Sequence, residues 1–112
     1  MDCLFCKIIA REIPASVRHE DADFVAFDDI HPKAPTHILI VPKRHIASVR
    51  ELATSDVALA GRLVLAARAI AEEAGIAEGG YRIIMNCGHD GGQIIPHLHL
   101  HLMGGKSLQG IM

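Results

Sequence analysis

Three histidines occupy alternate positions near the end of the chain: His97, His99 and His101 are separated by leucines. Side chains of a β-strand alternate between its two faces, so this spacing predicts a strand with three imidazoles on one face. Neighbouring rings on that face would lie about 6 to 7 Å apart, which is the span of a phosphate group. One imidazole can attack or transfer a proton while the others neutralise the oxygens of the reacting group. The row therefore favours phosphoryl or nucleotidyl chemistry.

A transition-metal site built from all three histidines is the main alternative, because imidazole is a common ligand of such ions. Rings at alternate positions of one strand are, however, spread along a line, which places them poorly for closing on a single ion. We rank phosphoryl or nucleotidyl transfer above metal binding for this triplet.

The composition bounds the class of protein. The chain has 112 residues, of which 50% are hydrophobic and 21% charged, so we expect one compact domain over residues 1–112. Its 11 basic and 13 acidic residues leave no electrostatic footprint for nucleic acid, although a single nucleotide fits this balance. No apolar run approaches the roughly 20 residues of a membrane span, and no signal peptide is evident, so we expect a cytoplasmic protein. Three cysteines argue against a disulfide framework.

Several elements must position the histidines. In the first half of the chain we expect a short helix over Cys3–Ile13 and two strands over residues 16–20 and 23–28, joined by a tight turn. A loop with two prolines follows over residues 30–36. The continuous apolar run of residues 37–41 then predicts a buried strand.

The main helix is predicted between the capping oxygens of residues 54–56 and Gly75, after one or two helical turns in residues 45–52. A strand over 81–87, a tight loop over 88–92 and the histidine strand complete the chain. This order predicts an α+β domain: an antiparallel sheet of about five strands with one main helix and a short N-terminal helix. The residues of the main helix at core spacing are Val57, Ala60, Leu63, Val64, Ala67, Ile70, Ala71 and Ala74.

The histidine motif resembles that of the histidine triad family. The resemblance covers Phe5 to Gly105 and rests on four segments, which are Phe27-Asp28-Asp29-Ile30, Ala34-Pro35-Thr36-His37, Gly91-Gly92-Gln93 and His97-Leu98-His99-Leu100-His101-Leu102-Met103. The chain looks most like the nucleotide-binding branch, whose members are purine nucleoside phosphoramidases. Dinucleoside polyphosphate hydrolases are the nearest alternative, and a largely non-catalytic nucleotide-binding adaptor is another. The resemblance implies the histidine triad fold and a homodimer whose sheet extends across the two-fold axis.

The resemblance also implies a mechanism. His99 would attack the α-phosphorus of a phosphoramidate or acyl-nucleotidylate and form a nucleotidyl-histidine, which water converts to AMP or GMP. The carbonyl of His97 would hold the other ring nitrogen of His99, and His101 would hydrogen-bond the phosphate or the leaving group. His37 would support the cluster, although a buried histidine is also an ordinary structural residue. No cofactor is implied for catalysis.

Further residues match the nucleotide-binding positions of the family. Asp29 matches the carboxylate that accepts hydrogen bonds from both ribose hydroxyls. Three features depart from the branch: Ile94 stands where many members carry a hydroxyl, Pro96 stands where an aromatic is frequent, and the tail over 106–112 lacks tryptophan, so the sequence does not fix the leaving group. The remaining matches are Phe5, Ile8, Phe27 and Ile30 for the base slot, and Asn86, Gly92 and Gln93 near the phosphate, beside His99 and His101. Each of the four apolar residues would also be an ordinary core residue.

A second constellation begins with Cys3 and Cys6, a C-x-x-C pair. A redox role for such a pair needs a βαβ context that this order of elements lacks. By resemblance to microbial members of the family, Cys3, Cys6, His45 and His97 would form a tetrahedral Cys₂His₂ set for a structural zinc ion. The ion would pin the N-terminal helix to the histidine strand.

Overall fold

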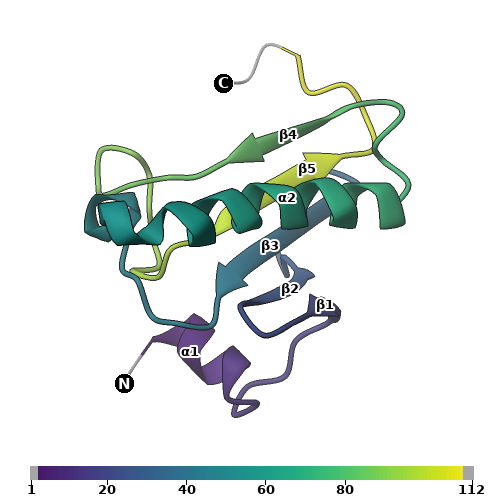
Figure 1. Cartoon of the computed structure of the whole chain (residues 1–112). Coiled ribbons are helices and arrows are strands. Elements are labelled where there is room, and N and C mark those ends of the chain that lie inside the picture. Colours follow the sequence, from purple (N-terminus) through teal and green to yellow (C-terminus); the bar gives the residue numbers. More distant parts are fainter. Residues whose placement is uncertain (1–2, 110–112) are drawn as a thin grey trace.

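The computed structural model describes residues 3–109; the last three residues of the tail, 110–112, lie outside this range. A five-stranded antiparallel sheet with the order β1-β2-β3-β5-β4 forms the centre of the domain (Figure 1). Its strands are β1 (Val17–Glu20), β2 (Phe24–Asp28), β3 (Thr36–Pro42), β4 (Tyr81–Ile84) and β5 (Leu100–Gly104). The predicted α+β class and the antiparallel sheet are confirmed.

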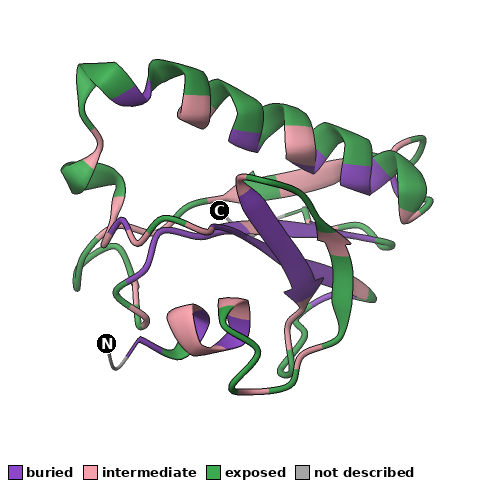
Figure 2. Cartoon of the chain, turned by 60° about the horizontal axis from the view of Figure 1, so that its bottom comes forward, coloured by how far each residue is buried: buried purple, intermediate pink, exposed green. Residues whose placement is uncertain are grey.

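Helices cover both faces of the sheet. The long helix α2 (Val57–Glu73) packs on one face, and the short helix α1 (Leu4–Ile9) lies on the opposite side (Figure 2). Two 3₁₀ turns, η1 (Val49–Glu51) and η2 (Thr54–Asp56), lead into α2. Within residues 3–109, no helix combines the length and the apolar character that crossing a membrane requires.

The alternation of residues in β3 creates two separate cores. Ile38 and Ile40 belong to the cluster under α2, whereas Leu39 and Val41 belong to the cluster under α1. Complete burial of each such side chain stabilises the fold by about 1.5 to 3 kcal/mol. His101 pairs with Leu39 across the strands, so its side chain lies on the α1 face.

Helix α1 is shorter than the predicted Cys3–Ile13. It ends at Ile9 because Arg11 takes a left-handed conformation with φ of 65°, and the N–H of Glu12 donates to the carbonyl of Lys7. This arrangement satisfies the last carbonyls of the helix and turns the chain away before Pro14. Because position 11 is an arginine and not a glycine, the sequence does not predict that the helix ends there.

Helix α2 ends as predicted, with Gly75 at φ of 77° after the last turn. Its predicted core face is wrong at two positions, because Val57 is 72% exposed and Val64 is 48% exposed. Both lie on one flank of the helix, beside the stripe that packs on the sheet. That buried stripe consists of Leu63, Ala67, Ile70 and Ala71.

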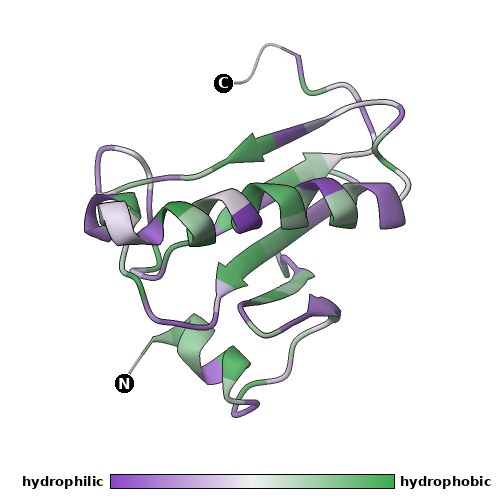
Figure 3. Cartoon of the chain, viewed as in Figure 1, coloured by the Kyte–Doolittle hydropathy of each residue, from purple (hydrophilic) through white to green (hydrophobic). Residues whose placement is uncertain are grey.

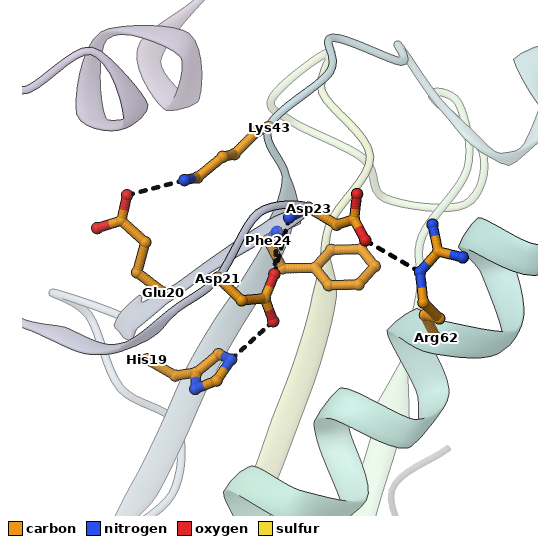
Figure 4. Close-up of polar contacts among 7 residues, drawn as sticks. All are labelled: His19, Glu20, Asp21, Asp23, Phe24, Lys43 and Arg62. Atoms are coloured by element: carbon orange, nitrogen blue, oxygen red, sulfur yellow. Dashed lines mark hydrogen bonds and ion pairs between the residues drawn. The ribbon is translucent and has the colours of Figure 1, made fainter.

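The β1–β2 hairpin fixes the opposite flank of α2. The Asp21 carboxylate accepts hydrogen bonds from the N–H groups of Asp23 and Phe24, both at 2.8 Å, and so shapes the turn (Figure 4). Arg62 of α2 reaches across to the carboxylate of Asp23 at 3.0 Å. The polar flank of α2 therefore faces the hairpin, and the flank that carries Val57 and Val64 faces β4 at the other end of the sheet.

Candidate active site

The predicted His97, His99 and His101 all lie on the α1 face, where His37 of β3 joins them. Strand β5 begins only at Leu100, so His97 and His99 precede it, and the ring of His97 contacts Cys3 and His45. The N–H of His97 bonds the carbonyl of Ile95 at 2.8 Å in a bend, yet the alternation holds, because Leu98, Leu100 and Leu102 all lie in the cluster under α2. The ring centroids of His99 and His101 are 4.9 Å apart, and those of His101 and His37 are 5.2 Å apart. The row is thus His99, His101 and His37.

A backbone contact fixes the neutral tautomer of His99. Its Nδ1 lies 2.7 Å from the carbonyl oxygen of His97, and because a carbonyl only accepts, Nδ1 carries the proton. In the neutral ring, Nε2 therefore holds a lone pair. Nε2 has no hydrogen-bond partner among the described residues. Every fully buried side-chain nitrogen or oxygen of residues 3–109 does have a partner, so Nε2 is not fully buried and reaches solvent. This nitrogen is free to attack an electrophile.

His37 and His101 form a hydrogen-bonded pair beside it. The Nε2 atom of His37 is 2.9 Å from Nδ1 of His101. Burial lowers the pKa of His37 and lowers that of His101 to about 4, with the charges of His99 and His37 acting in the same direction on His101. Both rings are therefore neutral at pH 7.

Asp29 lies at the edge of this pair. Its Oδ2 is 3.5 Å from Nε2 of His37, and its Oδ1 accepts a hydrogen bond from the N–H of His31 at 2.8 Å. The N–H of Asp29 in turn donates to the carbonyl of His37 at 2.9 Å. The structure brings this carboxylate to the histidine row, and its role on a ribose stays a prediction.

The four residues matched to the base slot divide into two groups. Phe5, Ile8 and Phe27 are buried in the cluster under α1, with the rings of Phe5 and Phe27 5.5 Å apart. Phe5 also meets the ring of His99 edge-on at 5.0 Å. Ile30, by contrast, is 84% exposed. The buried three are core residues whatever else they contact.

The loop before the histidines is held by amide side chains. Asn86 donates to the carbonyl of Gly91 at 2.8 Å, and the Gln93 amide donates to the carbonyls of Ala47 at 2.8 Å and Ile95 at 2.9 Å. The oxygen of Gln93 accepts from the N–H of Gly88 at 2.9 Å. The side chain of Gln93 is thus engaged in positioning the loop.

Glycine is required in this loop. A Cβ atom at Gly91 would clash with the carbonyl oxygen of Cys87, and Gly92 has φ of 80°. The predicted tight loop is confirmed, and its backbone lies close to the end of β4. Strand β4 stops at Ile84 rather than at the predicted residue 87, because the chain turns into this loop.

The four predicted metal ligands converge. The Sγ of Cys3 lies 3.3 Å from Nδ1 of His97, the Sγ of Cys6 lies 3.3 Å from Nδ1 of His45, and the two Nδ1 atoms are 3.1 Å apart. Bond lengths of zinc to nitrogen and sulfur in a tetrahedron imply about 3.3 Å between two nitrogens and about 3.5 Å between nitrogen and sulfur. The donor set therefore fits a tetrahedral ion.

Proton positions support this fit. The Nε2 of His97 is 2.8 Å from the carbonyl of Pro42, so it donates and leaves Nδ1 with the lone pair that a metal needs. Burial and the neighbouring Cys3 thiol raise the pKa of Cys6. A bound cation would supply the positive charge that lets both thiols ionise.

Two backbone groups that the sequence does not predict orient the rings of His37 and His97. They are the N–H of Lys33 on His37, at 3.1 Å, and the carbonyl of Pro42 on His97. Backbone groups are the same in every residue and leave no sequence signal. Only the proline-rich turn before His37 pointed to a constrained backbone there.

Comparison with known proteins agrees with this geometry. The family model described as "Scavenger mRNA decapping enzyme C-term binding" matches residues 2–111. A purine nucleoside phosphoramidase from Escherichia coli K12 is 47% identical over 107 residues, which are 96% of this chain and 90% of the relative. Solved structures of similar proteins share the fold.

A HIT family hydrolase from Legionella pneumophila superposes with a TM-score of 0.96 at 44% identity, covering 98% of each chain. A histidine triad protein from Clostridium difficile also gives a TM-score of 0.96, at 42% identity, covering 100% of this chain and 97% of that one. The arrangement of the sheet, the two helices and the histidines, together with these matches, shows that the chain belongs to the histidine triad (HIT) family.

Proposed function

We propose that the protein hydrolyses purine nucleoside 5′-phosphoramidates or acyl-nucleotidylates to nucleoside monophosphates through a nucleotidyl-His99 intermediate. The observation that carries the proposal is the fixed tautomer of His99, with Nδ1 held by the His97 carbonyl and Nε2 open to solvent beside His101. The phosphoramidase activity named for the Escherichia coli relative supports the substrate class.

The reaction then has two displacements. Nε2 of His99 forms a bond to the α-phosphorus while the bond from phosphorus to the leaving nitrogen or oxygen breaks, and the leaving group departs with the electron pair; a leaving amine also takes up a proton from solvent. His101 stabilises the charge on the phosphoryl oxygens. Water then attacks the phosphorus, the bond from phosphorus to Nε2 of His99 breaks, a proton passes to solvent, and the nucleoside monophosphate is released.

Fluorogenic adenosine and guanosine phosphoramidates test this function directly. We expect turnover with release of the free amine and the nucleoside monophosphate. A protein that binds the nucleotide tightly without forming product would instead be a nucleotide-binding adaptor. Faster cleavage of a dinucleoside polyphosphate than of either phosphoramidate would place the chain among the polyphosphate hydrolases.

We also propose that Cys3, Cys6, His45 and His97 hold a structural zinc ion. The support is the set of distances given above and the proton of His97, which the Pro42 carbonyl keeps away from the cluster. When bound, the ion would supply positive charge to the two thiolates and join α1 to the residues before β5. Since these thiols must stay reduced to act as ligands, we place the protein in the cytoplasm.

A homodimer is proposed from the surface formed by α2 and β4. Strand β4 is at the edge of the sheet, and Ile83 on this strand is 38% exposed on the α2 face. Val57, Gly61 and Val64 line the flank of α2 that faces β4, and Figure 3 shows apolar residues along both elements. A second copy related by a two-fold axis would pair the edge strands and cover this flank.

The Ile83→Asp variant is expected to weaken dimerisation by about 100-fold, because it buries an unpaired carboxylate in the interface. Size-exclusion chromatography with light scattering over a concentration series measures the change. Val17→Asp on the other edge strand, where Val17 is 37% exposed, is the matched control and should leave the dimer unchanged. Equal weakening by both variants, or a wild-type protein that is monomeric throughout, would contradict the proposed interface.

A further inference from the structure

We propose that His37 is a positioning residue that locks His101 as a hydrogen-bond donor, so that His101 stabilises the reacting phosphate without giving up its proton. The role on the phosphate rests on the proposed function. The lock itself is a property of the free protein and is argued from the hydrogen bonds around the two rings.

The chain of hydrogen bonds begins at a backbone group. The N–H of Lys33 lies 3.1 Å from Nδ1 of His37, and an amide N–H can only donate. Nδ1 of His37 therefore carries no proton, and in the neutral ring the proton is on Nε2. His37 is 4% exposed, so water does not compete for this bond.

The proton on His37 decides the tautomer of its neighbour. Nε2–H of His37 donates to Nδ1 of His101 at 2.9 Å, with the Asp29 carboxylate as a second, longer acceptor at 3.5 Å. Nδ1 of His101 is thus an acceptor, and its proton must be on Nε2. No described residue bonds that nitrogen, and it is not buried without a partner, so the N–H points to solvent beside His99.

This arrangement leaves His101 with no acid function. A second proton on His101 would have to enter at Nδ1, where the N–H of His37 already points, and a second proton on His37 is blocked by the N–H of Lys33. The groups facing the pair are His99, Asp29 and Lys33, and burial outweighs the Asp29 carboxylate in lowering the pKa of both rings. His101 thus donates a hydrogen bond to a phosphoryl oxygen and retains its proton throughout.

The same bonds separate this cluster from the metal-ligand cluster. Asp29, His37 and His101 also converge closely enough to hold a cation. A metal on Nε2 of His37 would require a proton on Nδ1, facing the N–H of Lys33 at 3.1 Å, which is repulsive. At His97 the opposite holds, because the Pro42 carbonyl takes the ring proton and frees the inner nitrogen. The first cluster presents an N–H donor on His101, whereas the second presents lone pairs that suit a cation.

Nitrogen-15 NMR of histidine-labelled protein tests the lock without any substrate. We expect His37 and His101 to appear as neutral Nε2–H tautomers whose shifts do not change between pH 8 and pH 5. In His37→Leu the lock is lost, and the pKa of His101 should rise towards about 6.5. His37→Gln, whose amide oxygen accepts from Lys33 and whose NH₂ donates to His101, should restore the wild-type tautomer. Titration of wild-type His101 in this range, or an Nδ1–H tautomer, would overturn the proposal.

Turnover of two substrates tests the donor role. His101→Gln keeps an acceptor for His37 and a donor for the phosphate but has no proton to transfer, whereas His101→Ala removes the donor. We expect kcat to fall about 100-fold in His101→Ala and less than about 10-fold in His101→Gln. For each variant, the fold-loss in kcat should be the same with a basic amine leaving group as with a carboxylate leaving group.

A loss in His101→Gln that matches His101→Ala for the amine and disappears for the carboxylate would show that His101 is a general acid, and would overturn the donor role. Absence of turnover in the wild-type protein would contradict the proposed function instead, and the NMR result would still decide whether the lock exists.

Discussion

The His99→Ala variant is expected to hydrolyse a nucleoside phosphoramidate at least about 10⁴-fold more slowly than the wild-type protein. The variant lacks Nε2 of His99, which in the neutral tautomer holds a lone pair open to solvent beside the ring of His101. Without it, water would have to displace the leaving group in one step. Steady-state kinetics with the fluorogenic phosphoramidate measure the loss.

Three measurements make this result specific. His99→Ala should still fold and bind the nucleotide, although the loss of one hydrogen bond and of the ring contact with Phe5 lowers its melting temperature. His89→Ala is the matched control, because the His89 side chain is fully exposed and should have no effect. Acid quenching during turnover should trap a nucleotide on the peptide that contains His99. Residual activity above about 1%, or a nucleotide trapped on another residue, would refute the role of His99.

The sequence predicts best the elements whose apolar residues follow a clear pattern and that end at a proline or a glycine. Strand β3 is a continuous apolar run closed by Pro42, and α2 ends at Gly75 because only glycine takes that conformation without cost. The pairing of His101 with Leu39 follows from the same alternation that placed the leucines of β5 in the core. The type and order of these elements can therefore be predicted from the apolar pattern and from the residues at their ends.

The sequence does not reveal the direction in which a side chain points or whether an apolar surface packs inside the chain or against a partner. The alternation of the leucines holds from Leu98 to Leu102, but the contact of the His97 ring with the cysteines, after a bend that a local hydrogen bond makes, has no signal in the sequence. Val57 and Val64 match the helical period of the core, yet they lie on a flank that a partner is proposed to cover. The amide of Gln93 could contact a ligand, but it donates its hydrogen bonds to the carbonyls of Ala47 and Ile95. In each case burial or backbone geometry decides among side chains of similar chemistry.

His97 connects the two sites of the molecule. Its carbonyl orients the ring of His99, while its own ring faces the two cysteines and His45. Phe5 stands in the sequence between Cys3 and Cys6 and contacts the ring of His99. An ion bound by this cluster would therefore hold both the backbone behind His99 and one wall of its surroundings.

Loss of the proposed ion should consequently have a large effect on stability. The double variant Cys3→Ser and Cys6→Ser is expected to bind no zinc, whereas the wild-type protein should contain about one ion per chain by elemental analysis. Removing a ligand that binds only the folded state should cost about 3 kcal/mol or more, which lowers Tm by more than about 10 °C. Chelation of the wild-type protein should reproduce this shift.

Cys87→Ser is the matched control, because Cys87 is also a free thiol and lies outside the cluster. It should retain the ion and the wild-type melting temperature. Hydrogen exchange adds a local test: the apo protein should lose protection in α1, which contributes only six residues and few backbone bonds of its own, before it loses protection in β3. If the purified protein carries no metal and chelation leaves Tm unchanged, the four side chains hold α1 by hydrogen bonds alone, and the zinc proposal is wrong.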